Sequence, residues 1–143
     1  MKQQTEKTYT IREVAQKFNM KSSTLRYYED VGLLTHVERT ASGKRIYRDM
    51  HLHRLSTICC FKNAGMSIAQ LQQFFRCEED EAANIDEIIS LLQEQKTQLE
   101  TEMTQLEKDY AHIKRKLSYY TDVKKAELHD LPRPDWANYR CDD

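Results

Sequence analysis

The chain has 143 residues, of which 39% are hydrophobic and 31% are charged. This length allows one modest hydrophobic core and argues against a large catalytic cleft. No apolar run approaches the roughly 18 residues that a membrane-spanning helix needs, and the polar start lacks the apolar segment of a secretion signal. We therefore expect a cytoplasmic protein that does not enter a membrane.

The charges are divided unevenly along the chain. Residues 1–76 hold 13 basic and 6 acidic side chains, whereas residues 77–143 hold 9 and 17. A basic half followed by an acidic half is typical of a module that meets nucleic acid joined to one that does not. A solvated imbalance with no partner is the alternative.

Two short helices are predicted near the start of the chain. Residues 1–8 are polar and lack periodicity, so we expect a flexible arm. Thr10 and Glu13 then have the spacing of a capping box, which marks a helix start. The apolar positions that follow repeat at helical spacing: Ile11, Val14, Ala15 and Phe18.

The second helix is expected from the N-cap Ser22 to a stop at Gly32. Leu25 and Tyr28 share its inner side, which leaves a cationic and aromatic outer face suited to a polyanion. A tight turn joins the two helices, so the pattern indicates a helix-turn-helix over about residues 11–30. A plain helical hairpin within a larger core would give the same pattern.

A small β-hairpin, or wing, is predicted over about residues 35–48. Arg39, Lys44 and Arg45 flank the turn signal Ala41-Ser42-Gly43. Cations on such a hairpin can bind phosphates beside the groove that a helix enters. A solvated loop is the alternative.

Two further helices are expected before the long one. Asp49 is the expected N-cap of a helix that runs to about Asn63 and is followed by Gly65. Its apolar arc contains Leu52, Leu55, Ile58 and Cys59. Ser67 and Gln70 repeat the capping-box spacing and start the next helix, whose apolar side is formed by Ile68, Leu71, Phe74 and Phe75.

A long dimerisation helix is predicted over residues 84–122 from two interleaved seven-residue repeats. At 1.5 Å per residue, its apolar stripe would be roughly 54 Å long, which a lone helix cannot bury. A partner helix is expected, with packing onto its own domain as the alternative. The expected dimer interface, broken only by the polar Lys96, contains Ile85, Ile89, Leu92, Leu99, Met103, Leu106, Tyr110, Ile113 and Leu117.

Residues 123–143 are expected to form a short tail and not a ligand-binding domain. Its Trp136 either docks onto the body or belongs to a disordered segment.

The sequence closely resembles the MerR family of transcription regulators. The resemblance lies in YTIREVAQKFNMKSSTLRYYEDVGLL, RTASGKRIYRDMHLHRL and CFKNAGMSIAQLQQFF, and it extends from Tyr9 to about Tyr120. It implies a mostly α fold, with a winged helix-turn-helix DNA-binding domain over residues 9–78 followed by the coiled-coil helix. It also implies a homodimer through an antiparallel coiled coil, and partners in double-stranded promoter DNA and RNA polymerase. No enzymatic activity and no cofactor are expected.

The resemblance also implies which residues contact DNA. The first set is Arg26, Tyr27, Arg45 and Tyr47, and the second is Lys21, Thr24, Arg39 and Lys44. Arginine binds guanine edges or phosphates, and one sequence does not separate these.

The four cysteines lack a C-x-x-C pair, and in a reducing cytosol they should be thiols. Cys60, within CFKNAGMSI, resembles the sensor position of a family branch that responds to aldehydes, nitric oxide and other electrophiles. A passive small hydrophobe is the alternative. Cys77 resembles a position where metal-responsive members place a thiolate, but Cys141 lies at the far end of the chain. We predict no metal site.

The resulting functional prediction is a regulator that activates stress or detoxification genes by distorting promoter DNA after an electrophile or thiol-oxidative signal. A metal-responsive regulator of the same family is the main alternative. A thiol oxidoreductase using Cys59 and Cys60 is disfavoured, because neighbouring cysteines of a helix point apart. A purely architectural DNA-binding dimer also stays open.

Overall fold

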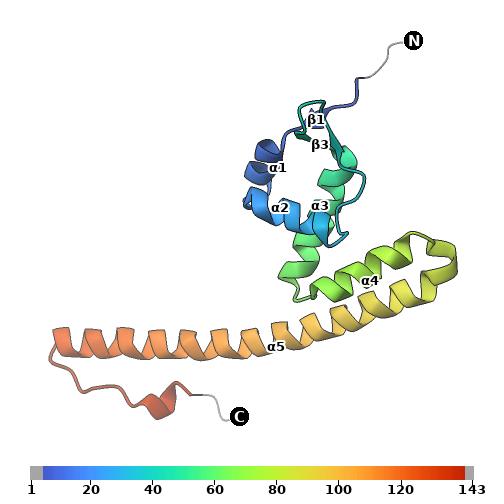
Figure 1. Ribbon diagram of the computed structural model, residues 1–143. Helices are drawn as coiled ribbons and strands as arrows, with labels where there is room; N and C mark the ends of the chain where they lie inside the picture. The colour runs from blue at the N-terminus through green and yellow to red at the C-terminus, as the bar shows by residue number, and fades with distance from the viewer. Residues whose placement is uncertain (1–4, 141–143) are drawn as a thin grey trace. The chain divides into compact units, whose positions relative to one another are not determined.

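The computed structural model describes residues 5–140 and divides into two compact units, Met1–Gln95 and Lys96–Asp143. It is mostly helical, as predicted, and the longest helix, α5 (Glu81–Leu128), runs through the boundary between the units. Figure 1 gives the labels used below.

The first unit begins with the predicted helix-turn-helix, α1 (Ile11–Lys17) and α2 (Ser22–Asp30). Thr10 caps α1, because its hydroxyl accepts from the Glu13 amide at 3.2 Å. The expectation that Ser22 caps α2 is wrong. Lys21 has the extended backbone of an N-cap (φ −78°, ψ 147°), because the tight turn after α1 ends at Met20 and leaves Ser22 as the first helical residue.

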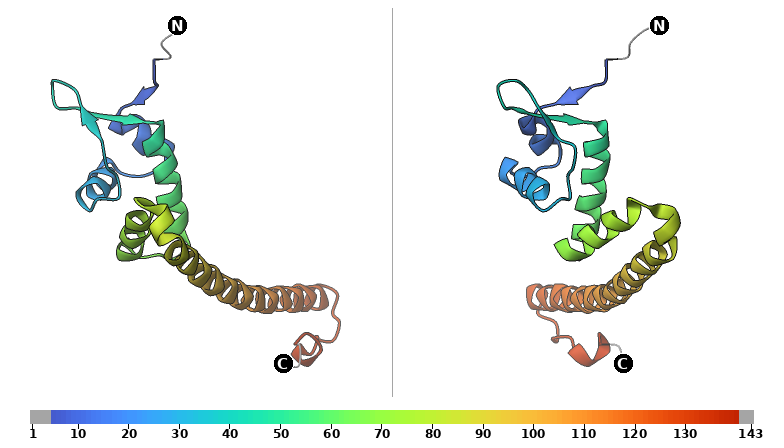
Figure 2. Two further views of the ribbon diagram at one scale, coloured as in Figure 1. Left: turned by 90° about the vertical axis from the view of Figure 1, so that its right-hand side faces the viewer. Right: turned by 45° about the vertical axis from the view of Figure 1, so that its right-hand side comes forward.

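Three short antiparallel strands lie beside these helices in the order β1-β3-β2, where β1 is Thr8–Tyr9, β2 is Glu38–Arg39 and β3 is Arg45–Arg48. Arg39 pairs with Arg45, and the hairpin between them turns at Gly43, whose φ of +85° favours glycine. The hairpin protrudes as a loop in Figure 2. Of the arm expected over residues 1–8, residues 1–4 lie outside the described residues, and Thr8 belongs to β1, where it pairs with Arg48.

Strand β3 leads directly into α3 (Asp49–Asn63), so the N-cap lies one residue before the expected Asp49. Arg48 is the N-cap, because the strand's extended backbone ends there, and Asp49 is the first helical residue. The capping box predicted at Ser67 and Gln70 is confirmed at the start of α4 (Ile68–Glu78), with bonds of 2.8 and 3.1 Å.

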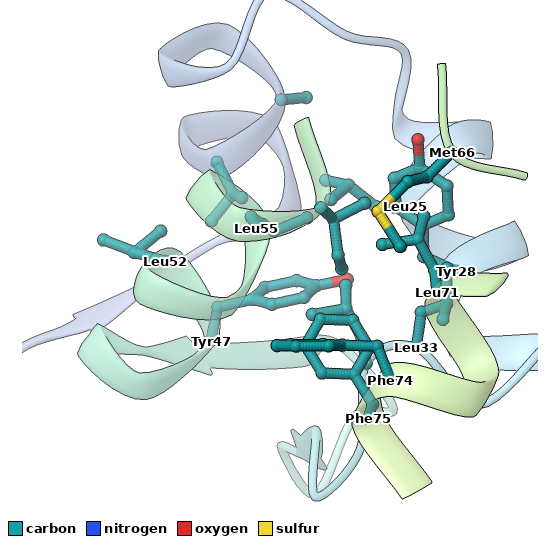
Figure 3. Close-up of a cluster of buried hydrophobic side chains, with 14 of the residues drawn as sticks. Leu25, Tyr28, Leu33, Tyr47, Leu52, Leu55, Met66, Leu71, Phe74 and Phe75 are labelled. Carbon is teal, nitrogen blue, oxygen red and sulfur yellow. The ribbon is translucent and has the colours of Figure 1, made fainter. Parts of the chain in front are cut away.

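One hydrophobic core joins α2, β3, α3 and α4 (Figure 3). Leu25, Leu33 and Leu55 are fully buried in it, and the rings of Phe61, Phe74 and Phe75 meet edge to face. This core holds the helix-turn-helix and the hairpin in one module.

Helix α5 is longer at both ends than the predicted 84–122. The seven-residue repeat ends near residue 120, but Val123 and Ala126 are buried and sustain the helix to Leu128. Pro132 follows, and the Leu131 amide donates to the Ala126 carbonyl at 2.8 Å.

The C-terminal segment, residues 129–140, folds back along the end of α5 within the second unit (Figure 1). The ring of Tyr119 contacts those of Trp136 and Tyr139, each with centroids 5.4 Å apart. The Tyr139 hydroxyl also bonds the Asp122 carboxylate. Trp136 is therefore docked on α5, as one of the two expectations from the sequence had it. Cys141 lies outside the described residues.

Candidate nucleic-acid interface and thiol site

Five of the eight side chains predicted to contact DNA are exposed on α2 and the hairpin, namely Lys21, Arg26, Tyr27, Arg39 and Lys44. Tyr27 has 47% of its surface exposed, whereas its neighbour Tyr28 is buried. Thr24 and Arg45 are partly exposed. The predicted division of α2 into an inner apolar side and an outer cationic face is confirmed.

The fold brings the helix and the hairpin together around one cavity of 310 Å³. Arg26 comes from α2, and Lys44 and Arg45 come from the hairpin. The rest of the wall is made by Thr10, Ile11 and Gly43. Glu29 balances the charge of Arg45, so Arg26 and Lys44 give the cavity a net positive potential suited to a phosphate group.

Arg45 is held in place by an ion pair inside the module. Its Nε lies 2.7 Å from Glu29 Oε2, and both side chains are largely shielded from solvent. The hydrogen bond to Glu29 raises the pKa of the Arg45 guanidinium against the opposing effect of burial. The pair links the hairpin to α2 and fixes the spacing of their cations.

Tyr47 differs from the other predicted DNA contacts because its exposed fraction is 0%. Its ring points into the core (Figure 3) and meets the His51 ring edge-on at 5.8 Å. Burial raises the pKa of its phenol, and the hydroxyl has no hydrogen-bond partner among the described residues. The side chain belongs to the core, which the expectation from the sequence did not foresee.

Two residues that position the interface were missed by the sequence analysis. His51 is buried, with Nδ1 accepting from the Arg48 amide and Nε2 lying 2.9 Å from the Thr35 carbonyl. Because Nδ1 accepts, Nε2 carries the proton and donates. His51 thereby ties the start of the hairpin to its end. No periodic or spacing signal distinguishes it from an exposed histidine.

Arg54 is the second missed residue. Its guanidinium lies 3.8 Å from the centroid of the Phe75 ring, and its Nε donates to the Leu33 carbonyl at 2.7 Å. Burial lowers the pKa of Arg54. This side chain connects α3 and α4 to the loop that follows α2.

The three described cysteines differ in exposure and thiol chemistry. Cys60 is exposed on α3, Cys59 is partly buried and Cys77 is buried on α4. Burial raises the pKa of the Cys59 thiol. Burial and then a hydrogen bond with Glu87 raise the pKa of the Cys77 thiol. A raised pKa disfavours the reactive thiolate, so neither Cys59 nor Cys77 is primed as a nucleophile.

Among residues 5–140, no three histidine, cysteine or carboxylate side chains are grouped so that they could hold a metal ion. Within the same residues, no helix combines the length and the apolar composition that crossing a membrane requires.

The predicted dimer interface lies on α5 and is mostly uncovered in the single chain. We call the nine predicted interface residues, together with Lys96, the seam. Exposed fractions are 40% at Leu92, 59% at Met103, 66% at Leu106 and 68% at Leu117. Among the seam residues only Leu99 is partly buried. The complete seam contains Ile85, Ile89, Leu92, Lys96, Leu99, Met103, Leu106, Tyr110, Ile113 and Leu117.

A winged helix-turn-helix with a cationic helix and hairpin, followed by a long helix, defines a class of DNA-binding regulators. Comparison with known proteins identifies the family. Residues 9–77 match the model of the MerR HTH family regulatory protein, and residues 52–115 match that of the MerR, DNA binding region. The chain belongs to the MerR family of transcriptional regulators, a family without enzymatic activity.

The relatives include proteins of different description. An uncharacterised HTH-type transcriptional regulator of Haemophilus influenzae is 32% identical over 117 residues, which are 82% of this chain and 87% of that protein. The heavy metal-dependent transcription regulator 1 of Rhizobium meliloti is 28% identical, with 68% and 67% covered.

Among solved structures, the chain is similar to HiNmlR, a MerR family regulator lacking the sensor domain, crystallised bound to promoter DNA. The TM-score is 0.77 at 30% identity, and the match covers 90% of this chain and 100% of that one.

Proposed function

We propose that the protein acts as a homodimer on double-stranded promoter DNA and regulates transcription by RNA polymerase after an electrophile or a thiol oxidant reacts with Cys60. Such a regulator works in the cytoplasm. The observation that carries the proposal is the cationic cavity shared by α2 and the hairpin, in a chain whose α5 leaves an apolar seam uncovered.

In the proposed complex, α2 enters the major groove and the hairpin lies along the phosphates. Arg26 and Tyr27 contact DNA from α2, and Arg39, Lys44 and Arg45 contact it from the hairpin, with Lys21 and Thr24 at the edge. Tyr47 is left out because it is buried. The HiNmlR structure, which is bound to promoter DNA, supports this arrangement.

The dimer forms by antiparallel packing of two α5 seams. Exposed leucine, isoleucine and methionine side chains at seven-residue spacing support this, because their burial against a second copy is favourable at about 25 cal/mol per Å². The two helix-turn-helix modules, held at a fixed separation, then bind the two half-sites of a pseudo-palindrome. Distorting the promoter between them costs a few kcal/mol, which phosphate contacts can offset.

Cys60 is the proposed sensor because it is exposed, whereas Cys59 and Cys77 have raised pKa values. It also lies where α3 meets α5. The Cys60 carbonyl accepts from the Ala64 amide at 3.0 Å, and the Ala64 carbonyl accepts from the Gln95 side chain. Near the other end of α3, Arg54 holds the loop after α2. An adduct at Cys60 would therefore disturb α3, which contacts both the helix-turn-helix module and α5.

The decisive experiment measures promoter transcription with the wild type, Cys60→Ser and the matched Cys59→Ser across aldehydes, thiol oxidants and metal ions. We expect electrophiles or oxidants to induce the wild type and Cys59→Ser, while Cys60→Ser loses the response but keeps operator affinity within about twofold. An unchanged response of Cys60→Ser would contradict the assignment.

A metal-responsive regulator is the second candidate. It is supported by Cys77 in the last turn of α4 and by the similarity to a heavy metal-dependent regulator. Induction by a metal ion alone, lost in Cys77→Ser and kept in Cys60→Ser, would favour it.

A further inference from the structure

Lys96 is the charged member of an otherwise uncharged seam on α5. It makes an ion pair with Glu100 of the same helix, with Nζ to Oε1 at 2.9 Å, and both side chains are more than half exposed. A lysine among leucine, isoleucine and methionine side chains lowers the stability of a coiled coil, but a single polar seam residue is a known means of fixing register.

The seam has a symmetry that restricts how a second copy can lie on it. When the partner helix runs in the opposite direction and Ile85 is level with Leu117, every seam residue is level with a seam residue of the other copy. Lys96 is then level with Leu106 of the partner subunit. We call this the centred register.

A slide by one heptad competes with the centred register. It places Lys96 level with Ile113 of the partner subunit and uses Tyr120 while Ile85 loses its partner. The opposite slide leaves Leu117 level with Glu78 of the partner subunit, outside α5, and Ile113 level with the small side chain of Ala82 of the partner subunit. Apolar matching therefore disfavours this slide but does not separate the other slide from the centred register.

The charged residues that flank the seam distinguish the centred register from the shifted one. Glu100, Glu107 and Lys114 follow one another at seven-residue intervals on the flank of α5 next to Lys96. In an antiparallel pair, the same flanks of the two helices face each other. In the centred register, Lys96 therefore lies beside Glu107 of the partner subunit.

In the shifted register, Lys96 lies beside Lys114 of the partner subunit, and Glu100 faces Glu107 of the partner subunit. Both contacts are between like charges, and each occurs twice in a symmetric dimer. The centred register has one like-charge contact, because Glu100 faces Glu100 of the partner subunit across the two-fold axis. It also has two opposite-charge contacts between Lys96 and Glu107 of the partner subunit, whereas the shifted register has four like-charge contacts. The charges thus favour the centred register and oppose the shifted one.

We propose that Lys96 sets the register of the antiparallel dimer through an ion pair with Glu107 of the partner subunit. This inference rests on the dimer proposed above and names the residue pair that aligns the two helices. Correct alignment fixes the distance between the two DNA readers.

The first test is a charge exchange followed by sedimentation equilibrium. Lys96→Glu and Glu107→Lys should each raise the dimer dissociation constant about tenfold, because each creates two like-charge contacts. The double variant should return to within about threefold of the wild type. Lys108→Glu and Glu94→Lys make the same charge changes on the outer side of α5, and neither should weaken the dimer more than about twofold.

The second test reads the register directly by disulfide cross-linking and mass spectrometry of the joined peptides. Both chains keep Lys96. A chain carrying Leu92→Cys with Tyr110→Cys should give a dimer linked between positions 92 and 110, which are level in the centred register. A chain carrying Leu92→Cys with Leu117→Cys, which are level in the shifted register, should give no 92–117 link.

The outcomes separate this inference from the proposed function. A monomeric wild type would overturn the proposed dimer itself. A stable dimer in which the charge exchange fails to restore affinity, or in which positions 92 and 117 cross-link, would overturn only the role of Lys96.

Discussion

At the scale of single residues, chemical type alone did not separate exposed residues from core residues. Arg26 and Tyr47 both match the family pattern, yet the first is exposed and the second has no exposed surface. The difference arises because β3 is covered by α1 and α3, which turns the Tyr47 ring inward. That depends on packing between distant segments, which a local sequence pattern does not contain.

Replacing Tyr47 by phenylalanine tests its placement in the core. Loss of a buried hydroxyl that has no partner among the described residues should raise the free energy of unfolding by about 1 kcal/mol. Promoter affinity should stay unchanged. The comparison is Tyr27→Phe, which should leave stability unchanged, since the Tyr27 ring is exposed. A loss of DNA affinity in Tyr47→Phe alone would reverse this assignment.

Arg26→Ala should weaken promoter binding at least tenfold, or about 1.4 kcal/mol, because it removes a cation from the wall of the shared cavity. The salt dependence of binding reports the kind of contact, since losing a phosphate contact lowers the slope by about one. Lys62→Ala removes an exposed cation at the end of α3 and serves as the matched control. Equal losses in both variants would point to non-specific attraction.

The raised pKa of the Cys77 thiol predicts the direction of a pH effect on stability. Because the folded pKa exceeds the unfolded one, this thiol stabilises the fold fully below the unfolded pKa of about 8.5. That stability is lost as the pH rises toward the folded pKa. Chemical denaturation should thus show a falling free energy of unfolding above about pH 8.5, with a smaller fall in Cys77→Ser. Identical slopes would remove Cys77 as the cause.

At the scale of elements, periodicity and capping chemistry predicted most of the fold. The helices around Thr10 and Ser67 begin where the hydroxyl and the residue three positions later indicate. The boundaries missed by one residue, at Lys21 and Arg48, lie where a turn or a strand runs straight into a helix. Strand β1 was not predicted, because two residues are too short to show alternation.

The docked C-terminal segment is an element whose contribution can be measured. Trp136 packs on Tyr119, and the Lys116 ammonium lies 3.8 Å from its ring centroid. Trp136→Ala should increase hydrogen exchange in the last turns of α5 and lower local stability by about 1 to 2 kcal/mol, since the ring is only partly buried. Leu128→Ala, at an exposed position, should change exchange little. Unaltered exchange in Trp136→Ala would show that the contact contributes nothing.

At the scale of the whole molecule, the sequence alone predicted that α5 packs against a partner helix. The seven-residue repeat and the exposed seam both indicate a surface that needs another helix. What the repeat left open was the register. Charges at Lys96, Glu107 and Lys114 supply that information once the helix is continuous from residue 81 to residue 128.

In the proposed complex, two chains joined through α5 bind one promoter site. Light scattering of the protein on its promoter duplex counts these chains, for the wild type and for Leu106→Glu, which places a charge in the seam. We predict two chains per duplex for the wild type, and a monomer with at least 100-fold weaker binding for the variant, since a single reader makes half the contacts. One wild-type chain per duplex, or undiminished binding by a monomeric variant, would contradict the account.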